Sequence, residues 1–219
     1  MDSAALRLAL CAAGRRLVEA DLLGAAEGNL SARLPGGTFL VTPSGVSKAA
    51  LQPGQLIEVD AGGRVVGGSG RPTTELPMHL AAYAARPDAM ALVHAHPVTA
   101  VAFTIAGAAW PGDLVPEAAV TLGPVAVAPF AIPGTAEVPA SLAPFLAGHD
   151  VLLLSRHGAL CLGATVEEAV GRMETLERVA RMALAARALG RCEPLPPATV
   201  DAVLRAAGRP PRGDRKSVV

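Results

Sequence analysis

The feature that most constrains the fold of this 219-residue chain is a pair of histidines in the segment Ala91-Leu-Val-His-Ala-His-Pro97. Three apolar residues lead into the pair and a proline ends the segment, which predicts a buried strand. Side chains two residues apart on a strand point to the same face, so His94 and His96 are expected to project side by side. Adjacent imidazoles at the end of a strand favour a divalent-metal site.

A His-x-His segment also occurs by chance, and either ring could be a hydrogen-bonded core residue. Two further residues favour the metal. His157 ends a second apolar segment, and Glu75 stands just before a segment with helical periodicity. Three imidazoles and a carboxylate are a complete ligand set for Zn²⁺, although the same donors accept Mn²⁺, Co²⁺ or Fe²⁺. We therefore predict that these four side chains gather around one metal ion.

Three segments of small residues are candidates for binding an anion. The loop 43–45 follows a predicted strand, and exposed backbone N–H groups in such a loop bind phosphate oxygens. Thr73 and Thr74 place hydroxyl groups at the start of a predicted helix, which is a second potential anion site. Gly28 and Asn29 precede another strand, where a plain turn explains the sequence equally well.

The remaining pattern predicts alternating helices and strands. Helices are expected over residues 3–22, 76–86, 98–105, 136–146, 166–189 and 200–207, and strands over 30–33, 38–42, 56–60, 64–67, 91–97, 118–122, 125–129, 151–154 and 158–163. Ser3 is expected to cap the first helix, and Thr165 with Glu168 a later one. His79 lies on the helix after Glu75, where we expect a core residue or one that supports the ligands.

Composition narrows the class of protein. The formal net charge is zero, which does not suggest nucleic-acid or membrane partners, and no apolar run reaches the eighteen residues of a membrane span. The N-terminus lacks the basic residues of a signal peptide, and three cysteines form no motif, so we expect a cytoplasmic protein. We predict one domain over residues 1–207 and a mobile, Pro/Arg-rich tail over 208–219.

Five short motifs stand in one order along the chain: Gly28-Asn29, Ser44-Gly45, Thr73-Thr74-Glu75, His94-Ala-His96 and His157-Gly158. Their order and spacing resemble the class II aldolase/adducin family, whose enzymes include L-fuculose-1-phosphate aldolase and L-ribulose-5-phosphate 4-epimerase. The resemblance covers about residues 4 to 190. It implies an α/β fold, a three-layer α/β/α sandwich around a mostly antiparallel central sheet. It also implies a homotetramer with active sites at subunit interfaces.

The resemblance implies a role for each motif. His94, His96 and His157 would be the metal ligands, and Glu75 would be the catalytic acid/base and a further ligand when no substrate is bound. The remaining motif residues would bind the phosphate of a small sugar substrate: Gly28, Asn29, Ser44, Gly45, Thr73 and Thr74.

The activity implied is that of a class II aldolase, a carbon–carbon lyase. Such an enzyme cleaves a ketose 1-phosphate to dihydroxyacetone phosphate and an aldehyde through an enediolate that a divalent metal stabilises. Glu75 would deliver a proton to the enediolate. The epimerases of the family carry Asp at this position, so Glu75 favours the aldolase.

One departure from the aldolase pattern leaves alternatives open. The fuculose aldolase protonates its leaving aldehyde with a tyrosine, whereas residues 110–130 of this chain contain none. Glu117 or a water molecule could replace it. Decarboxylases of 3-oxo-acid phosphates and dehydratases of methylthioribulose phosphate share the family's fold and ligands. A non-enzymatic scaffold like adducin is disfavoured, because adducin lacks the complete ligand set.

Overall fold

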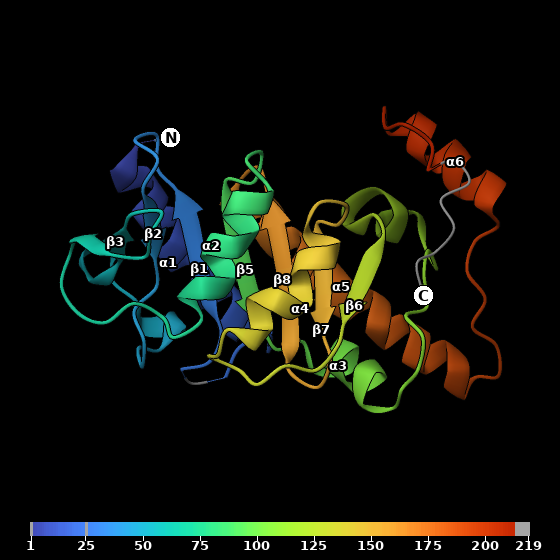
Figure 1. Cartoon of the computed structure of the whole chain (residues 1–219). Helices are drawn as coiled ribbons and strands as arrows, with labels where there is room; N and C mark the ends of the chain where they lie inside the picture. The colour runs from blue at the N-terminus through green and yellow to red at the C-terminus, as the bar shows by residue number, and fades with distance from the viewer. Residues whose placement is uncertain (1, 25, 213–219) are drawn as a thin grey trace.

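In the computed structural model, which describes residues 2–24 and 26–212, eight strands form one sheet (Figure 1). Its order is β4-β3-β2-β1-β5-β8-β7-β6. Every neighbouring pair is antiparallel except β6 and β7, so the sheet is mostly antiparallel, as predicted. The strands are β1 (Asn29–Arg33), β2 (Phe39–Val41), β3 (Ile57–Val59), β4 (Val65–Gly67), β5 (Ala91–Ala95), β6 (Val125–Ala128), β7 (Val151–Leu154) and β8 (Gly158–Gly163).

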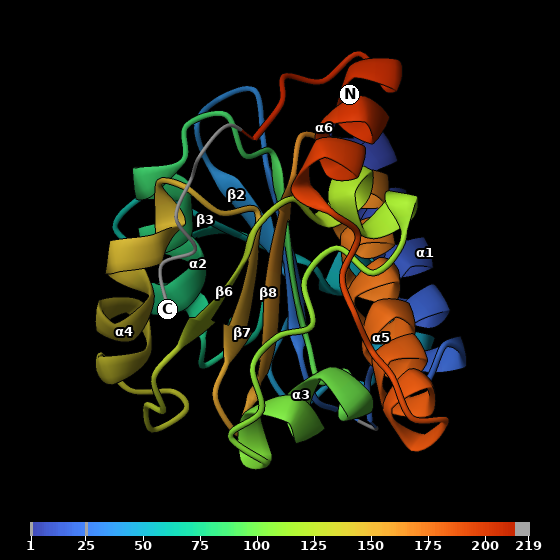
Figure 2. The ribbon, with the colours of Figure 1, turned by 90° about the vertical axis from the view of Figure 1, so that its right-hand side faces the viewer.

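Helices cover both faces of the sheet and complete the three layers (Figure 2). On one face lie α1 (Ser3–Glu19), α3 (Val98–Ile105) and α5 (Val166–Ala188), and on the other α2 (Leu76–Ala85) and α4 (Glu137–Leu146). Each face has its own apolar core because side chains alternate along a strand. In β5, Val93 packs in the core under α5, while Leu92 packs in the core under α2 and α4.

The sequence predictions were wrong at two places. Asp2 rather than Ser3 caps α1, since its carboxylate accepts a hydrogen bond from the backbone N–H of Ala5 at 2.8 Å. The segment Ala118–Leu122, predicted as a strand, is the π-helix η3. Its buried residues are 118, 119 and 122, a spacing that places them on one helical face rather than alternating across a sheet.

The C-terminal part of the described chain contacts the segment around η3. Helix α6 (Pro197–Ala206) packs Val200 and Leu204 against Ala119. The guanidinium of Arg212 forms an ion pair with Asp113. Residues 213–219, part of the tail that we predicted to be mobile, lie outside the described residues, so its mobility stays a prediction.

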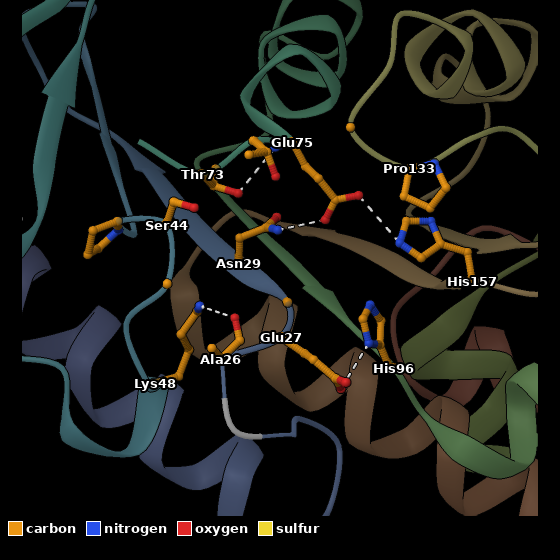
Figure 3. Close-up of a pocket in the computed structure, with 15 residues that line it drawn as sticks. Ala26, Glu27, Asn29, Ser44, Lys48, Thr73, Glu75, His96, Pro133 and His157 are labelled. Carbon is orange, nitrogen blue, oxygen red and sulfur yellow. Dashed lines mark hydrogen bonds and ion pairs between the residues drawn. The ribbon is translucent and has the colours of Figure 1, made fainter. Parts of the chain in front are cut away.

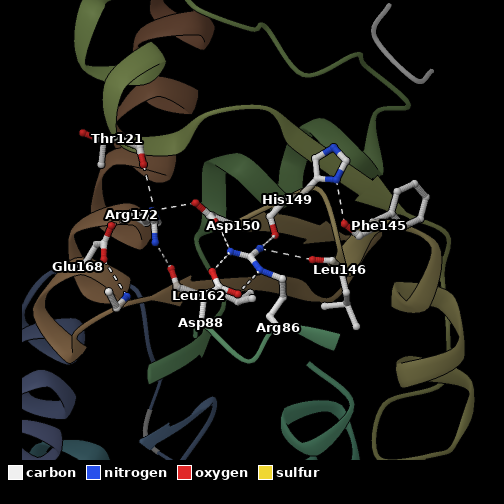
Figure 4. A network of polar contacts seen from close by, with 11 residues as sticks. Arg86, Asp88, Thr121, Phe145, Leu146, His149, Asp150, Leu162, Glu168 and Arg172 are labelled. Atoms are coloured by element: carbon white, nitrogen blue, oxygen red, sulfur yellow. Dashed lines mark hydrogen bonds and ion pairs between the residues drawn. The ribbon is translucent and has the colours of Figure 1, made fainter. Parts of the chain in front are cut away.

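A network of charged residues ties α5 and α2 to one end of the central strands (Figure 4). Arg86 pairs with Asp88 and Asp150, both at 2.7 Å. Arg172 pairs with Asp150 at 2.9 Å and with Glu168 at 2.8 Å. Both guanidinium groups also donate to backbone carbonyl oxygens. We call these five residues the arginine cluster.

None of the described helices combines the length and apolar character that crossing a membrane requires.

Candidate metal and substrate site

The three predicted histidine ligands meet at the end of β5 that lies opposite the arginine cluster. His94 is on β5 and faces the α2 side, His96 follows the strand, and His157 lies in the turn between β7 and β8. Their ring centroids are 4.8–5.4 Å apart. The turn approaches closely because residue 158 is glycine: a Cβ there would lie 2.5 Å from the carbonyl oxygen of Ala95.

Hydrogen bonds orient two of the rings so that their Nε2 atoms face each other. The Nδ1 of His94 lies 3.0 Å from the carbonyl oxygen of Ala159, an acceptor that requires this nitrogen to carry the proton. The Nδ1 of His96 lies 3.2 Å from the Glu27 carboxylate, which imposes the same tautomer. In neutral rings, both Nε2 atoms then present lone pairs to each other across 3.3 Å. A cation held between the two nitrogens would remove this repulsion, and metal-binding histidines adopt this arrangement.

Glu75 lies beside the three histidines at the N-terminus of α2. Its Oε2 lies 3.1 Å from His94 Nε2, and its Oε1 lies 3.4 Å from His157 Nε2. Glu75 Oε1 and His157 Nδ1 are buried and have no hydrogen-bond partner within the described part of the chain. Unpartnered polar atoms beside three imidazoles fit a divalent metal, so Glu75, His94, His96 and His157 are the residues that would hold it.

Burial favours the neutral form of two of the imidazoles, while neighbouring groups favour the charged form of the carboxylate. Burial lowers the pKa of His157 to about 4, and burial together with His94 lowers that of His96. Burial by itself would raise the pKa of Glu75, but hydrogen bonds and charge interactions with His94, Asn29 and His157 outweigh it and hold that pKa well below its usual range. Neutral imidazoles and an ionised carboxylate are the forms that bind metals.

The loop before β1 delivers Asn29 to this site. Gly28 has φ +60°, and a Cβ there would lie 2.2 Å from Leu23 and 2.6 Å from the carbonyl oxygen of His94, so only glycine fits. The next residue, Asn29, is buried, and its amide Nδ2 donates to Glu75 Oε2 at 2.8 Å. The Gly28-Asn29 motif, which the sequence explains equally well as a plain turn, therefore places the Asn29 side chain against the Glu75 carboxylate (Figure 3).

The predicted anion loops line one pocket of about 270 Å³ beside the histidines (Figure 3). Backbone pairing brings two of these loops together, since Pro43 and Pro72 form a β-bridge and the backbone N–H of Ser44 donates to the carbonyl oxygen of Arg71. The predicted site residues that line the pocket are Gly28, Asn29, Ser44, Gly45, Thr73, Thr74, Glu75, His96 and His157. His94 is fully buried and is not among the lining residues.

Two charged residues of the pocket were missed in the sequence. Lys48 is buried, and its Nζ donates to the carbonyl oxygens of Ala26 and Val46, both at 3.1 Å. Those partners hold the ammonium without neutralising it, and burial lowers the pKa of Lys48. Glu27 lies at the mouth of the pocket against His96. The signal for Lys48 was its position three residues after Gly45, directly beyond a predicted anion loop.

Glu117, named above as a possible replacement for the aldolase tyrosine, does not line this pocket. It is exposed and precedes η3. The only tyrosine in the sequence, Tyr83, is buried in the core between the sheet and α2.

A family model described as the class II aldolase and adducin N-terminal domain matches residues 8–184. The chain belongs to the class II aldolase/adducin family. One relative, the 3-oxo-tetronate 4-phosphate decarboxylase of Escherichia coli strain K12, is 32% identical over 159 residues, which cover 71% of this chain and 74% of the relative. The L-fuculose phosphate aldolase of the same strain is 31% identical over 169 residues, which cover 77% of each chain.

The fold agrees with this membership in the class II aldolase/adducin family. A solved structure of an L-fuculose 1-phosphate aldolase matches with a TM-score of 0.87 and 28% identity, covering 95% of this chain and 98% of that one. Members of two reaction classes, decarboxylase and aldolase, therefore resemble the chain to a similar degree.

Proposed function

We propose that this chain is a divalent-metal-dependent carbon–carbon lyase acting on a small phosphorylated sugar or sugar acid. The observation that carries the proposal is the meeting of three imidazoles and Glu75 at one wall of a pocket whose other walls are the predicted anion loops. The same pocket thus offers a metal site and a phosphate site within reach of one small substrate. The donor set favours Zn²⁺.

The two reaction classes found among the relatives share one intermediate. A four-carbon 3-oxo acid 4-phosphate that loses its carboxylate leaves the electron pair on the former C2, conjugated with the carbonyl at C3. A ketose 1-phosphate cleaved between C3 and C4 leaves the electron pair on C3, conjugated with the carbonyl at C2. Both products are the enediolate of dihydroxyacetone phosphate, and only the leaving group differs, CO₂ in one case and an aldehyde in the other.

The residues of the site fit the protonation of such an enediolate. A bound divalent cation would supply Lewis-acid stabilisation of the negative oxygens. Glu75 lies beside the histidines, where substrate oxygens would take its place and release its carboxylate to carry a proton. The released carboxylate would take up a proton from solvent water and then deliver it to the carbon that has lost its leaving group. The amide Nδ2 of Asn29 donates to Glu75 Oε2, and this hydrogen bond would hold the carboxylate while the substrate displaces it from the histidines.

The leaving group favours the decarboxylase over the aldolase as the first candidate. Forming an aldehyde requires a group that exchanges a proton with the sugar hydroxyl, whereas CO₂ departs without one. The single tyrosine of the sequence, Tyr83, is buried with its hydroxyl hydrogen-bonded to Ser31, which excludes it from this part. Within the described chain, Glu27 is the remaining acid near His96, and it would take this part in an aldolase. The aldolase is the second candidate, supported by the fuculose aldolase relative.

The phosphate would lie in the loops that contain Ser44, Gly45, Thr73 and Thr74. Their hydroxyl and N–H groups are donors, and Lys48 adds a buried positive charge at the same wall of the pocket. Gly28 and Asn29 form the third side. This arrangement would bind a phosphorylated substrate in preference to its unphosphorylated analogue.

One experiment separates the candidates. The zinc-loaded protein is incubated with 3-oxo-tetronate 4-phosphate and, separately, with L-fuculose 1-phosphate, while CO₂ and dihydroxyacetone phosphate are measured. Release of both products from the first substrate supports the decarboxylase, and dihydroxyacetone phosphate from the second supports the aldolase. Turnover that survives exhaustive chelation would contradict the whole proposal.

We also propose a cytoplasmic homotetramer with active sites at subunit interfaces. The three cysteines are free thiols, which suits a reducing compartment. Phe130 and Ile132 are more than half exposed and directly precede Pro133 at the pocket wall, so a neighbouring subunit would cover them beside the site. Light scattering of the purified protein tests the stoichiometry.

A further inference from the structure

A chain of buried hydrogen bonds leads away from Glu75 into the core between the sheet and α2. Four contacts form it in sequence: Tyr83 hydroxyl to Ser31 Oγ at 2.9 Å, Ser31 Oγ to His79 Nδ1 at 2.6 Å, His79 Nε2 to Asn29 Oδ1 at 2.5 Å, and Asn29 Nδ2 to Glu75 Oε2 at 2.8 Å. None of the four residues before Glu75 is a candidate metal ligand; His79 and Tyr83 come from α2, and Asn29 and Ser31 from β1.

The carboxylate at one end determines the direction of every hydrogen bond. Ionised Glu75 only accepts, so Asn29 must turn its NH₂ group towards it and its Oδ1 towards His79. His79 must then carry its proton on Nε2, which leaves Nδ1 as an acceptor for the Ser31 hydroxyl. Ser31 in turn accepts from Tyr83. One assignment of protons satisfies all four contacts, and reversing the Asn29 amide would place its oxygen against the carboxylate.

The surroundings hold this network rigid and His79 neutral. His79 and Ser31 are fully buried, and the ring of Tyr83 stacks on Phe39 with centroids 4.5 Å apart. Burial lowers the pKa of His79 to about 3. Burying a chain of polar groups in an apolar core stabilises the fold less than apolar side chains of the same shape would. We therefore expect the chain to have a function at one of its ends.

We propose that His79 is a positioning residue: its Nε2–H holds the Asn29 amide in the single orientation that presents an N–H to Glu75. Glu75 is thereby kept ionised and pointed at the histidines until substrate displaces it, while the second N–H of the Asn29 amide stays directed at the pocket. The kinetic consequence rests on the function proposed above, whereas the orientation of the amide does not.

The orientation is tested first, on the unmodified metal-free protein. A two-bond ¹H–¹⁵N correlation spectrum of protein labelled with ¹⁵N-histidine shows which ring nitrogen carries the proton. The inference requires a neutral Nε2–H tautomer for the resonance that disappears in His79→Phe. An Nδ1–H tautomer or a doubly protonated ring at neutral pH would overturn it. This measurement does not depend on the reaction that the enzyme catalyses.

The consequence is tested with three variants of the zinc-loaded enzyme and whichever substrate is turned over. His79→Phe removes the donor and keeps the ring volume; we expect kcat to fall about 10- to 100-fold with little change in KM and with zinc retained. His79→Gln retains an N–H that reaches Asn29 and should recover part of the loss. Tyr83→Phe keeps the ring stacked on Phe39 and should stay within about threefold of the unmodified enzyme.

The pattern across these variants distinguishes positioning from packing. Equal losses in His79→Phe and His79→Gln, or a loss in Tyr83→Phe as large as in His79→Phe, would indicate that the network only supports the core, and would overturn the inference. A crystal structure of His79→Phe in which the Asn29 amide keeps its orientation would also overturn it. If no substrate is turned over, the proposed function fails, while the spectrum and the crystal structure still decide the positioning role.

Discussion

The two ends of the central strands carry two polar clusters that are built on opposite principles. In the arginine cluster, Arg86 and Arg172 share Asp150 between them, and each has a further carboxylate and backbone carbonyls as partners. At the other end, His94 and His96 face each other with lone pairs, and Glu75 Oε1 is buried without a partner in the described chain. Charges that are satisfied internally stabilise a fold, whereas groups left unsatisfied await a ligand.

Glu75→Gln, at the histidine end of the strands, should cause the largest loss of activity. The amide keeps the shape of the side chain but cannot carry the proton, so we expect kcat to fall about 1,000-fold. Zinc should still bind through the three imidazoles, as measured by metal analysis after gel filtration. Unchanged turnover would remove Glu75 from the acid/base role. His96→Ala is the matched variant, in which zinc and activity should be lost together.

Asp150→Asn perturbs the arginine cluster and should have the opposite pattern. It removes the charge shared by two largely buried guanidinium groups, each of which keeps one other carboxylate, Asp88 or Glu168. We expect a loss of about 2 kcal/mol in the free energy of unfolding. Urea unfolding measures this, and kcat of the folded enzyme should stay unchanged. A kcat loss without a stability loss would show that the two ends are coupled.

Lys48→Met tests substrate binding, because it removes from the pocket a positive charge that no carboxylate neutralises. The methyl end keeps most of the side-chain volume, so the fold should persist. Loss of a charge-assisted contact with phosphate should raise KM about 10-fold and leave kcat nearly unchanged. Thr74→Ala serves as a control at the same wall and should raise KM by less. A KM that stays constant would place the phosphate elsewhere.

A further prediction concerns the pH dependence of the metal-free protein. The pKa of His79 is about 3 in the folded state and about 6.5 when unfolded, so its neutral burial stabilises the fold above pH 6.5. That contribution decreases as the pH falls towards 3, by up to about 1.4 kcal/mol per pH unit. Urea unfolding at pH 6.5, 5.5 and 4.5 should show a steeper loss for the unmodified protein than for His79→Phe. Parallel pH profiles would contradict a neutral, buried His79.

The arginine cluster should not share this pH dependence. Hydrogen bonding to Arg86 holds the pKa of Asp88 below its ordinary value, so its charge persists through the range in which the histidines titrate. Asp88→Asn should therefore shift the stability by a nearly constant amount between pH 6.5 and 4.5.

Some features of the site followed from local pattern alone. Alternation along β5 predicted that His94 and His96 would lie together, and they do. Gly28 and Gly158 stand where a Cβ would collide with neighbouring backbone, a need that local sequence expresses as glycine. The family membership confirmed the mostly antiparallel three-layer fold.

Other features depended on which segments pack together. Segment 118–122 reads as a strand by composition, but its buried residues must face α5 and α6 at once, and a helical turn does this. Nothing in the sequence near Lys48 indicates that its ammonium is buried beside Ala26, since the two residues are 22 positions apart.

By itself, the sequence determined the residue types and spacings: three imidazoles, one carboxylate and the small residues that let loops approach each other. Only the tertiary structure decided how those groups are oriented, because orientation depends on partners that are distant in the chain. His79 gives the physical reason. Its tautomer is set by Asn29 and Ser31, which belong to strand β1 rather than to helix α2. The tautomer in turn determines which atom of the Asn29 amide faces Glu75, and no local sequence pattern indicates these contacts.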